Sequence, residues 1–374
     1  MDFRLSAQEL EIQQKARAFA QTHLAPNADY WDREGIFPEE ALRQCAREGL
    51  TGLTVPTEAG GPGATSTAYA LAIMELAEGC SASAVTIAVS SMVAEVLYTF
   101  GTPDHHERYL RPLLRGEITS GSFALSEPGA GSDPGGMRTR ALPEGDTFRI
   151  NGEKSWISSG THSGVFVVWA RTEDVPGSRA ISTVLTQPGD EGFFLGRKED
   201  KMGLRASTTI SLQFEDCVVP AARLLGERGR GFPVAMKALD GGRIGVSSQA
   251  IGIGNAALKA TKRYFNEVRR PSAVQQDILQ KMEVELRAAR LLALQAARLK
   301  DNKRPFSSQA AMSKAYSTEA ANRVCQQAVT LLGADGASPD FPVQRLLRDC
   351  KVTTIYEGTS EVQRIVISRS ILRS

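Results

Sequence analysis

The sequence has little of several features that would narrow its function at once. Its five cysteines are scattered, and none is separated from another by the two residues typical of zinc and redox motifs. The formal net charge is only +2, so there is no basic footprint for nucleic acid. No uninterrupted apolar run approaches the roughly 18 residues of a membrane helix. These absences argue against a metal site, a nucleic-acid partner and a membrane span, and they favour reduced thiols.

The first residues of the sequence do not resemble a targeting signal either. The first ten residues, MDFRLSAQEL, contain neither the apolar core of a signal peptide nor an Arg/Ser-rich transit pattern, which predicts a cytoplasmic location. What the chain does have is material for more than one hydrophobic core. It is 374 residues long, 42% apolar and 23% charged, as is typical of water-soluble globular proteins.

The hydrophobic pattern changes twice along the chain. Helical spacing dominates up to about residue 115, short strands and turns dominate between Gly121 and Val219, and helical spacing resumes at Gly231. We therefore predict an α+β protein in which a small β domain separates two helical blocks. The expected domains are residues 1–119, 120–226 and 227–374, without internal repeats or low-complexity segments.

Individual elements follow from periodicity and from end signals. Ser6 and Glu9 predict a capping box that starts the first helix, and Pro26 is expected to end it. The other expected helices are 39–48, 67–80, 84–100, 104–114, 238–267, 277–300 and 309–332. The expected strands are 147–150, 165–170, 181–185 and 210–214, and Asn151-Gly152 is the expected turn of a hairpin.

A short stretch near the end, Tyr356–Glu361, predicts a break between two helices. Ser360 followed three residues later by Gln363 indicates a capping box at the start of the last helix. Glu357 would then lie in the loop before it, where Gly358 allows the chain to turn and a carboxylate can reach a cleft. From the residues alone, an ordinary exposed loop glutamate remains the alternative.

The ten residues IYEGTSEVQR, from Ile355 to Arg364, resemble the C-terminal signature of the acyl-CoA dehydrogenases. The similarity extends over nearly the whole chain and is greatest to the short-chain, butyryl-CoA branch. It implies an N-terminal helical domain, a central small β-barrel or sandwich domain and a C-terminal four-helix bundle. By position, Glu357 corresponds to the catalytic base, Gly358 to a substrate contact, and Thr359 and Glu361 to cofactor contacts.

Two further segments resemble the flavin-binding motifs of this family. The first, FALSEPGAGSD, is a strand edge that enters a glycine-rich loop, whose exposed N–H groups can approach a ring or a phosphate. The resemblance assigns Phe123, Leu125 and Ser126 to FAD and Ser132 to the pantetheine part of the thioester. The second is Trp156-Ile157-Ser158, also assigned to FAD, although a lone Trp in a β domain is more often part of a core.

The segment Asp240-Gly241-Gly242-Arg243, expected to open a long helix, resembles an Asp-x-x-Arg element that contacts substrate. Its Gly242 stands where one branch of the family carries its base, which leaves Glu357 as the candidate. An exposed salt pair at a helix start is the alternative for Asp240 and Arg243.

The sequence also departs from the family. The Arg-x-x-Phe-Gly motif that grips the far half of FAD across a subunit interface is replaced by a shortened segment. Arg269 or Arg270 could substitute there, since a guanidinium pairs with phosphate in bidentate fashion. The usual Gln-x-x-Gly-Gly is also altered, and Thr330 and Gly333 occupy the matching positions.

The resemblance implies FAD-dependent dehydrogenation of an acyl-CoA to the trans-2-enoyl-CoA. It also implies an electron-transfer flavoprotein as acceptor and a homotetramer built as a dimer of dimers. Two alternatives remain open. The chain could oxidise an acyl group on a carrier protein, or it could be a flavin-poor, non-catalytic subunit of a hetero-oligomer. An intact Glu357 argues against the second.

Overall fold

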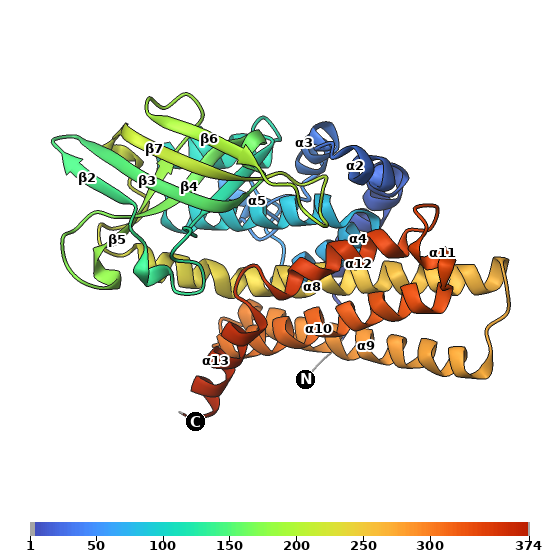
Figure 1. Ribbon diagram of the computed structural model, residues 1–374. Coiled ribbons are helices and arrows are strands. Elements are labelled where there is room, and N and C mark those ends of the chain that lie inside the picture. The colour runs from blue at the N-terminus through green and yellow to red at the C-terminus, as the bar shows by residue number, and fades with distance from the viewer. Residues whose placement is uncertain (1–3, 373–374) are drawn as a thin grey trace.

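Three consecutive segments of the chain form a helical block, a sheet and a second helical block in the computed structural model, which describes residues 4–372 (Figure 1). The sheet lies over one end of the long C-terminal helices, and the N-terminal helices pack along the same side. The predicted fold class is confirmed. Of the N-terminal segment discussed above, residues 1–3 lie outside the described part.

Within the described residues, the N-terminal block contains seven α-helices, joined by loops and short 3₁₀ and π turns. They are α1 (Ala7–Phe19), α2 (Ala28–Glu34), α3 (Glu39–Arg47), α4 (Ser66–Gly79), α5 (Ser81–Phe100), α6 (Pro103–His105) and α7 (Arg111–Leu114). The capping box is confirmed, because the Ser6 hydroxyl accepts from the Glu9 N–H and the Glu9 carboxylate accepts from the Ser6 N–H. Pro26 does not end the helical path. It lies in a 3₁₀ turn that joins a π turn to α2, near the start of that turn, where a missing N–H costs little.

Helix α5 has the composition of a membrane helix, although the sequence contains no uninterrupted apolar run of that length. Its 20 residues, with a mean hydropathy of 1.5, meet the length and composition of a membrane helix. However, 72% of its most apolar window is buried inside the fold, against α4, α8 and β1. It is the only described helix with this composition, and its burial is that of a core helix.

The β domain is a seven-stranded sheet. Its strands are β1 (Ser120–Ala124), β2 (Arg140–Glu144), β3 (Thr147–Ser158), β4 (Ser163–Arg171), β5 (Ile181–Thr186), β6 (Phe193–Lys198) and β7 (Thr209–Pro220). The spatial order is β1-β4-β2-β3-β7-β6, with β5 paired to β4, and β1 runs parallel to β4. All four predicted strands are present, each inside a longer one.

The predicted hairpin turn at Asn151-Gly152 is wrong. The turn lies at Gly145-Asp146, because Glu144 pairs with Thr147 across β2 and β3. Gly152 lies inside β3, where the pairing with β7 shifts register as in a β-bulge. Its φ is 137°, and a Cβ there would lie 2.8 Å from the Thr139 Cα, so the bulge requires glycine.

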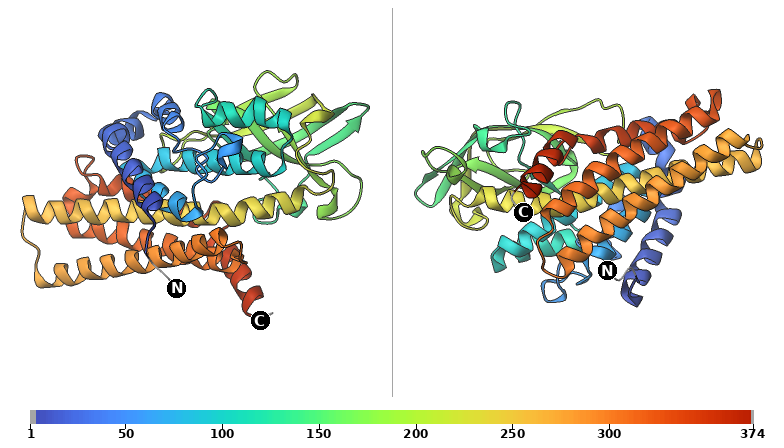
Figure 2. Two further views of the ribbon diagram at one scale, coloured as in Figure 1. Left: turned by 180° about the vertical axis from the view of Figure 1, so that it is seen from behind. Right: turned by 90° about the horizontal axis from the view of Figure 1, so that it is seen from below.

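The C-terminal block is dominated by three long helices that run side by side (Figure 2). Its helices are α8 (Gly231–Glu267), α9 (Ala273–Asp301), α10 (Ser307–Leu332), α11 (Ala334–Ala337), α12 (Val343–Lys351) and α13 (Ser360–Ile371). The three long helices predicted here are confirmed. α8 begins seven residues earlier than expected, so Asp240 and Arg243 lie inside the helix and do not open it.

Candidate active site

Glu357 lies in the predicted break, in a turn between the 3₁₀ turn Val352–Thr354 and α13. Its φ is 52°, a left-handed conformation that is uncommon for any residue except glycine, and Gly358 follows with φ 95°. The predicted capping box at Ser360 is wrong. Thr359 is the N-cap and accepts a hydrogen bond from the Val362 N–H, while Ser360 is the first helical residue.

Two side chains from different helices hold this turn through the carbonyl oxygen of Gly358, and one of them, Gln363, also donates to the Glu357 carbonyl oxygen at 3.5 Å. Lys314 of α10 donates to the Gly358 oxygen at 2.6 Å from Nζ, and Gln363 of α13 donates to it at 2.9 Å from Nε2. The Tyr356 hydroxyl also donates to the Gln249 side chain of α8. A strained conformation persists where its surroundings over-determine it, and this turn is fixed from α8, α10 and α13.

The Glu357 carboxylate lies directly over Gly242 of α8. A Cβ at residue 242 would be 2.0 Å from Glu357 Oε2 and 3.2 Å from Met92 Sδ, so any side chain there would displace the carboxylate. Oε2 is shielded from solvent and has no hydrogen-bond partner among the described residues. A buried polar atom without a hydrogen-bond partner is rare, which indicates that a group outside the described residues binds this oxygen.

Arg243 of α8 lies beside the Glu357 carboxylate. Its Nη1 donates to Asp240 Oδ1 at 2.6 Å, and Asp240 also accepts from the Ser307 hydroxyl. The side chain is buried, and Arg243 Nε has no partner among the described residues. Asp240, Arg243, Glu357 and Gly358, which the sequence singled out separately, are therefore brought together.

The charges around Glu357 perturb one another. Burial raises the pKa of Glu357 to about 7, against the opposing effect of Lys314 and Arg243. Burial likewise lowers the pKa of Lys314 to about 8, although Glu357 opposes this. Burial also lowers the pKa of Arg243. A carboxylate with a pKa near neutrality, in a shielded position, has the protonation behaviour required of a general base.

The two proposed flavin segments lie next to each other at the end of β1. The Ser155 N–H donates to the Ser126 carbonyl at 2.9 Å, and Lys154 Nζ donates to the Leu125 carbonyl at 3.2 Å. Trp156 is 67% exposed and has φ 62°, so it is not a core residue. An exposed indole held in a left-handed conformation is available to stack against a flat ring.

Their neighbours are fixed more deeply. Phe123 is half-buried, with its ring centroid 4.1 Å from that of Trp169, and Leu125 and Ile157 are buried. The Ser158 carbonyl accepts from the Ser122 hydroxyl at 2.7 Å. Ser132 is exposed in the glycine-rich loop, and Glu361 is exposed in the first turn of α13.

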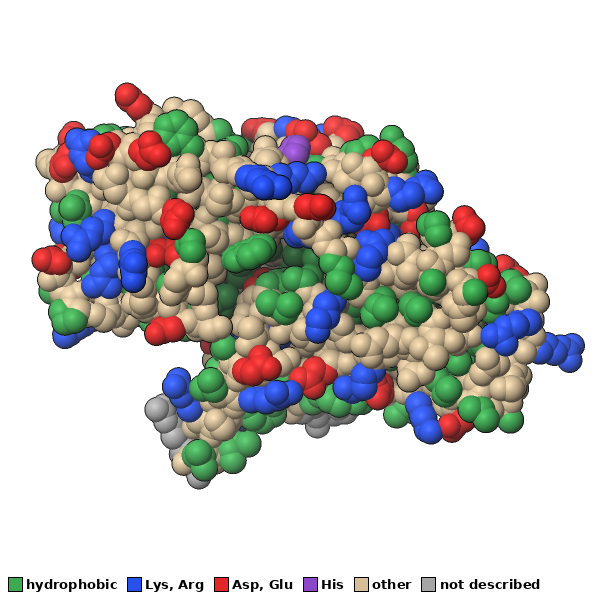
Figure 3. Space-filling view, viewed as in Figure 1, with side chains coloured by type: hydrophobic (Ala, Val, Ile, Leu, Met, Phe, Trp, Pro, Cys, Tyr) green, Lys and Arg blue, Asp and Glu red, His purple; other side chains and the backbone are tan. Residues whose placement is uncertain are grey.

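Helix α5 connects the two groups of residues. A Cβ at Gly121 of β1 would lie 2.7 Å from a Val93 side-chain atom, while the preceding residue, Met92, borders Gly242 and the Glu357 carboxylate. The strand that leads to Ser126 and the turn that carries Glu357 thus pack on neighbouring residues of one helix. Figure 3 shows a hollow lined by hydrophobic side chains between the β domain and the C-terminal helices.

The residues proposed for the far half of FAD lie elsewhere. Arg269 Nη2 donates to the Leu331 carbonyl at 2.8 Å, which places Arg269 beside Thr330 and Gly333 at the ends of α8 and α10. From Gly242 to Glu267 the axis of α8 runs about 37 Å, at 1.5 Å per residue. These residues are therefore at the opposite end of the bundle from Glu357 (Figure 1).

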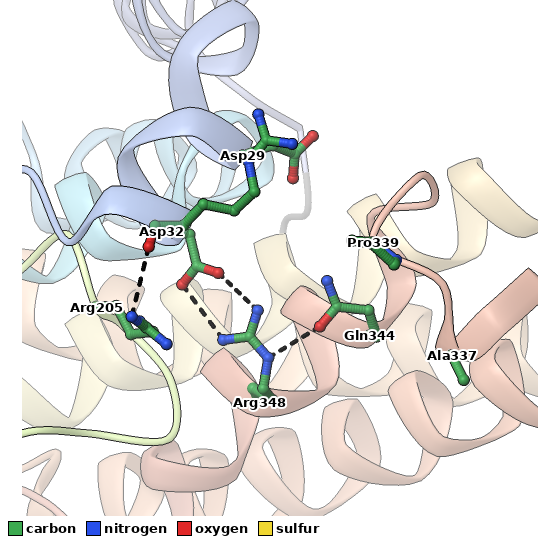
Figure 4. A pocket seen from close by; sticks show the side chains of 8 residues that line it. Asp29, Asp32, Arg205, Ala337, Pro339, Gln344 and Arg348 are labelled. Carbon is green, nitrogen blue, oxygen red and sulfur yellow. Dashed lines mark hydrogen bonds and ion pairs between the residues drawn. The ribbon is translucent and has the colours of Figure 1, made fainter.

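A charged cavity of about 330 Å³ also opens on the surface, between α2, the loop before β7 and α12 (Figure 4). In this cavity Arg348 binds Asp32 through two nitrogens and the Gln344 side chain through Nε. Within residues 4–372 there is no group of three His, Cys, Asp or Glu placed to hold a metal. Neither observation provides a second reactive centre.

Two buried lysines, Lys314 and Lys154, are not among the residues predicted from the sequence. A signal was present for Lys314, because it lies on the same face of α10 as Ala310, Ala311 and Ser317, at helical spacing from small residues. A lysine on a face that is otherwise small and buried indicates a charge with a partner inside the fold.

Comparison with known proteins covers almost the whole chain. Three family descriptions match: "Acyl-CoA dehydrogenase, N-terminal domain" over residues 6–117, the middle domain over 122–217 and the C-terminal domain over 229–372. Among curated relatives, an acryloyl-CoA reductase (NADH) of Anaerotignum propionicum is 40% identical over 100% of this chain and 96% of its own length. The mouse mitochondrial short-chain specific acyl-CoA dehydrogenase is 41% identical over 97% and 90%.

Solved structures agree with the sequence relatives. The butyryl-CoA dehydrogenase of Megasphaera elsdenii is 37% identical and covers 100% of both chains with a TM-score of 0.95. A structure described for the electron transferring flavoprotein of Acidaminococcus fermentans contains a chain that is 38% identical, with 100% coverage of both chains and a TM-score of 0.98.

Proposed function

This chain belongs to the acyl-CoA dehydrogenase family, and from that premise we propose that it oxidises a short-chain acyl-CoA to the trans-2-enoyl-CoA, with Glu357 as the base. The observation that carries the proposal is the Glu357 carboxylate, whose Oε2 is shielded, unpaired and seated over Gly242. Its pKa of about 7 allows it to accept a proton at neutral pH.

Acyl-CoA dehydrogenases are FAD flavoproteins, and the residues of this chain fit that cofactor. The exposed Trp156, the Ser126 loop and Ser158 would hold the ring half, since their backbone geometry is fixed by the contacts described above. FAD would accept the hydride that leaves the β-carbon. The electrons would then pass to an electron-transfer flavoprotein, which we propose as the partner.

The chain itself supplies the acid–base half of the reaction. The proton on the carbon next to a thioester carbonyl is too weakly acidic for a carboxylate in water, so the carbonyl oxygen must be stabilised as charge develops. The backbone N–H of Glu357 donates no hydrogen bond within the described residues and can meet that oxygen. Glu357 Oε2 then takes the α-proton in a position from which water is excluded.

The experiment that tests this function is anaerobic mixing of the purified protein with butyryl-CoA. We expect the purified protein to show a flavin absorbance spectrum that bleaches on mixing, with one trans-2-enoyl thioester formed per flavin reduced. Bleaching by an acyl-carrier-protein thioester, without bleaching by the CoA thioester, would favour the carrier-protein alternative. A protein that binds no flavin would be the non-catalytic subunit instead.

The acryloyl-CoA reductase relative supports a second candidate, the reverse reaction on a 2-enoyl-CoA. A carboxyl with a pKa of about 7 is half protonated at that pH, so Glu357 could return a proton to the α-carbon as readily as it removes one. Reoxidation of the chemically reduced protein by a 2-enoyl-CoA, measured against its reduction by the acyl-CoA, distinguishes the preferred direction.

We also propose that the active form is a homotetramer, a dimer of dimers. The residues assigned to the far half of FAD lie about 37 Å along α8 from the base within one chain, so they would serve the flavin of another chain. α13 projects from the body of the molecule, where it is available to a neighbouring copy (Figure 2). A cytoplasmic location, consistent with five buried free thiols, belongs to the same proposal.

Between the two candidate arginines, the structure favours Arg270 for the FAD phosphates. Arg269 is committed to the Leu331 carbonyl, and its guanidinium lies over the rings of Tyr264 and Phe265 at 5.7 and 5.2 Å. Arg270 is exposed and makes no hydrogen bond or ion pair within residues 4–372. Replacing Arg270 with Ala should weaken FAD binding by the apoprotein about ten- to a hundredfold, the effect of losing a charge-assisted contact.

Arg263→Ala is the matched control for Arg270→Ala, because Arg263 is also exposed near the end of α8 and, among the described residues, its one ion pair is with Glu267. FAD affinity should be measured for both variants by fluorescence titration of the apoprotein. Equal affinity in the parent and in Arg270→Ala would mean that other groups hold the phosphates.

A further inference from the structure

Lys314 is a fully buried lysine whose ammonium group lies against the turn that carries Glu357. Its side chain has no exposed surface, and its one hydrogen bond to a described residue goes from Nζ to the carbonyl oxygen of Gly358, at 2.6 Å. A buried charge is expensive unless it is paired, and a neutral carbonyl does not neutralise it. The charge of Lys314 must therefore be offset by a group that it does not touch directly.

The candidates for that group can be taken from each element packed around the turn. α8 contributes Arg243, which is itself cationic and is already bound to Asp240. α13 contributes Glu361, whose side chain is 74% exposed and so is screened by water. The remaining facing groups are the hydroxyls of Tyr69 on α4 and Tyr356, whose pKa values are raised by burial, with a further contribution from Glu357, and which therefore stay neutral. The Glu357 carboxylate, whose Oε2 is shielded from solvent, remains as the counter-charge of Lys314.

Lys314 and Gln363 donate to the same carbonyl oxygen, but only one of them is charged. Removing either donor would loosen the hold on Gly358. Removing Lys314 would in addition remove the cation that lowers the pKa of Glu357 most. The second cation, Arg243, has a smaller effect, because it is partly neutralised by Asp240. Removing each donor in turn therefore distinguishes a geometric role of Lys314 from an electrostatic role.

We propose that Lys314 is a positioning residue for the base, which holds the Glu357 turn through Gly358 and keeps the neighbouring carboxylate ionised near neutral pH. The inference rests on the proposed function only in treating Glu357 as the base. It adds a residue that acts on the base without touching the thioester.

The sign of the effect follows from the charges. A cation stabilises the ionised form of a neighbouring carboxyl, so Lys314 lowers the pKa of Glu357, and its loss must raise that pKa. In the parent, the rate of flavin reduction should rise with pH through an ionisation near 7, where Glu357 loses its proton. Above the pKa of Lys314, about 8, the parent also loses the cation, so the two proteins should become more alike.

The test compares Lys314→Met with Gln363→Met, which remove a charged and a neutral donor from the same oxygen and keep similar volumes. Flavin reduction by saturating butyryl-CoA is measured from pH 5.5 to 9.5. Lys314→Met should shift the midpoint upward by about one unit or more. For a midpoint moving from 7 to 8, this is a loss of roughly eightfold at pH 6.5 but less than about twofold at pH 9. Gln363→Met should leave the midpoint unchanged, whatever it does to the maximal rate.

A second measurement follows the protonation of Glu357 directly and does not depend on turnover. The infrared band of the protonated Glu357 carboxyl, identified by its absence from Glu357→Gln, is titrated in the folded, FAD-loaded parent and in Lys314→Met. The same upward shift is expected. An unshifted midpoint in Lys314→Met, or equal shifts in both Met variants, would overturn the electrostatic role of Lys314. Full activity of Glu357→Gln would instead overturn the base assignment, so the two failures are distinguishable.

Discussion

Replacing Glu357 with Gln is expected to slow the bleaching of bound FAD by butyryl-CoA by about 10²–10⁴-fold, the usual contribution of a general base. The substitution keeps the shape of the side chain and removes the proton acceptor. It breaks no hydrogen bond of Oε2, since that atom has no partner among the described residues. FAD content should therefore stay close to that of the parent, but thermal stability at neutral pH should fall, because the buried Lys314 loses its counter-charge. Stopped-flow absorbance under anaerobic conditions measures the rate.

Glu319→Gln is the matched control for this charge change. Glu319 lies on the surface of α10, where it pairs with Arg364 of α13, and its replacement should leave the rate unchanged. If Glu357→Gln bleached as fast as the parent, another group would have to be the base. Asp240 would then be the next acidic residue to examine, because it lies beside Arg243 on α8.

The helical framework could be predicted because its signals are local. The helix expected at 277–300 is Ala273–Asp301, and its apolar residues recur at three and four because one face packs against α8 and α10. The hairpin was placed wrongly because two dipeptides have turn composition, Gly145-Asp146 and Asn151-Gly152. Nothing local separates them, and the pairing of β3 with both β2 and β7 decides which one turns.

The cap of α13 was misplaced for a similar reason. Thr359 and Ser360 are both good N-cap residues, and Gln363 completes a capping-box pattern only with Ser360. In the fold, the Gln363 amide is used elsewhere, because it donates to the Gly358 carbonyl that Lys314 also binds. A tertiary contact from α10 therefore decides a choice that the local sequence leaves open.

The candidate site was predictable in part. Glu357, Gly358, Asp240 and Arg243 were singled out by resemblance and lie together, while their roles remain predictions. Periodicity alone does not show that Gly242 makes room for the carboxylate, since this depends on how closely the turn approaches α8. Lys314 and Lys154 were missed because a lysine is almost always exposed, and only the assembled fold shows which charge it faces.

The second large effect is expected in the β domain, where Lys154→Met should lower stability by about 3–5 kcal/mol. Lys154 is fully buried, and its Nζ lies 2.8 Å from Glu127 Oε1, which is itself almost fully buried. Burial lowers the pKa of Lys154 to about 8, so it is still protonated at neutral pH. Burial raises the pKa of Glu127, but Lys154 and the N–H groups of Arg138 and Thr139 bring it below its ordinary value.

Removing Lys154 would leave a buried carboxylate without its cation, which costs far more than the pair itself contributes. It would also remove the donor to the Leu125 carbonyl, next to Ser126 in the loop proposed to hold the flavin ring. We therefore expect the FAD-loaded variant to melt roughly 5–10 °C lower than the parent at pH 7 and to release FAD more readily.

Two further variants decide whether the isolated carboxylate is the cause. In the double variant Glu127→Gln/Lys154→Met no charge is left unpaired, so it should recover much of the lost stability, as a double-mutant cycle would show. Lys259→Met removes an exposed lysine that pairs with Glu78 on the surface, and it should cost less than about 1 kcal/mol. A Lys154→Met protein no less stable than Lys259→Met would mean that the Lys154–Glu127 pair does not stabilise the flavin loop.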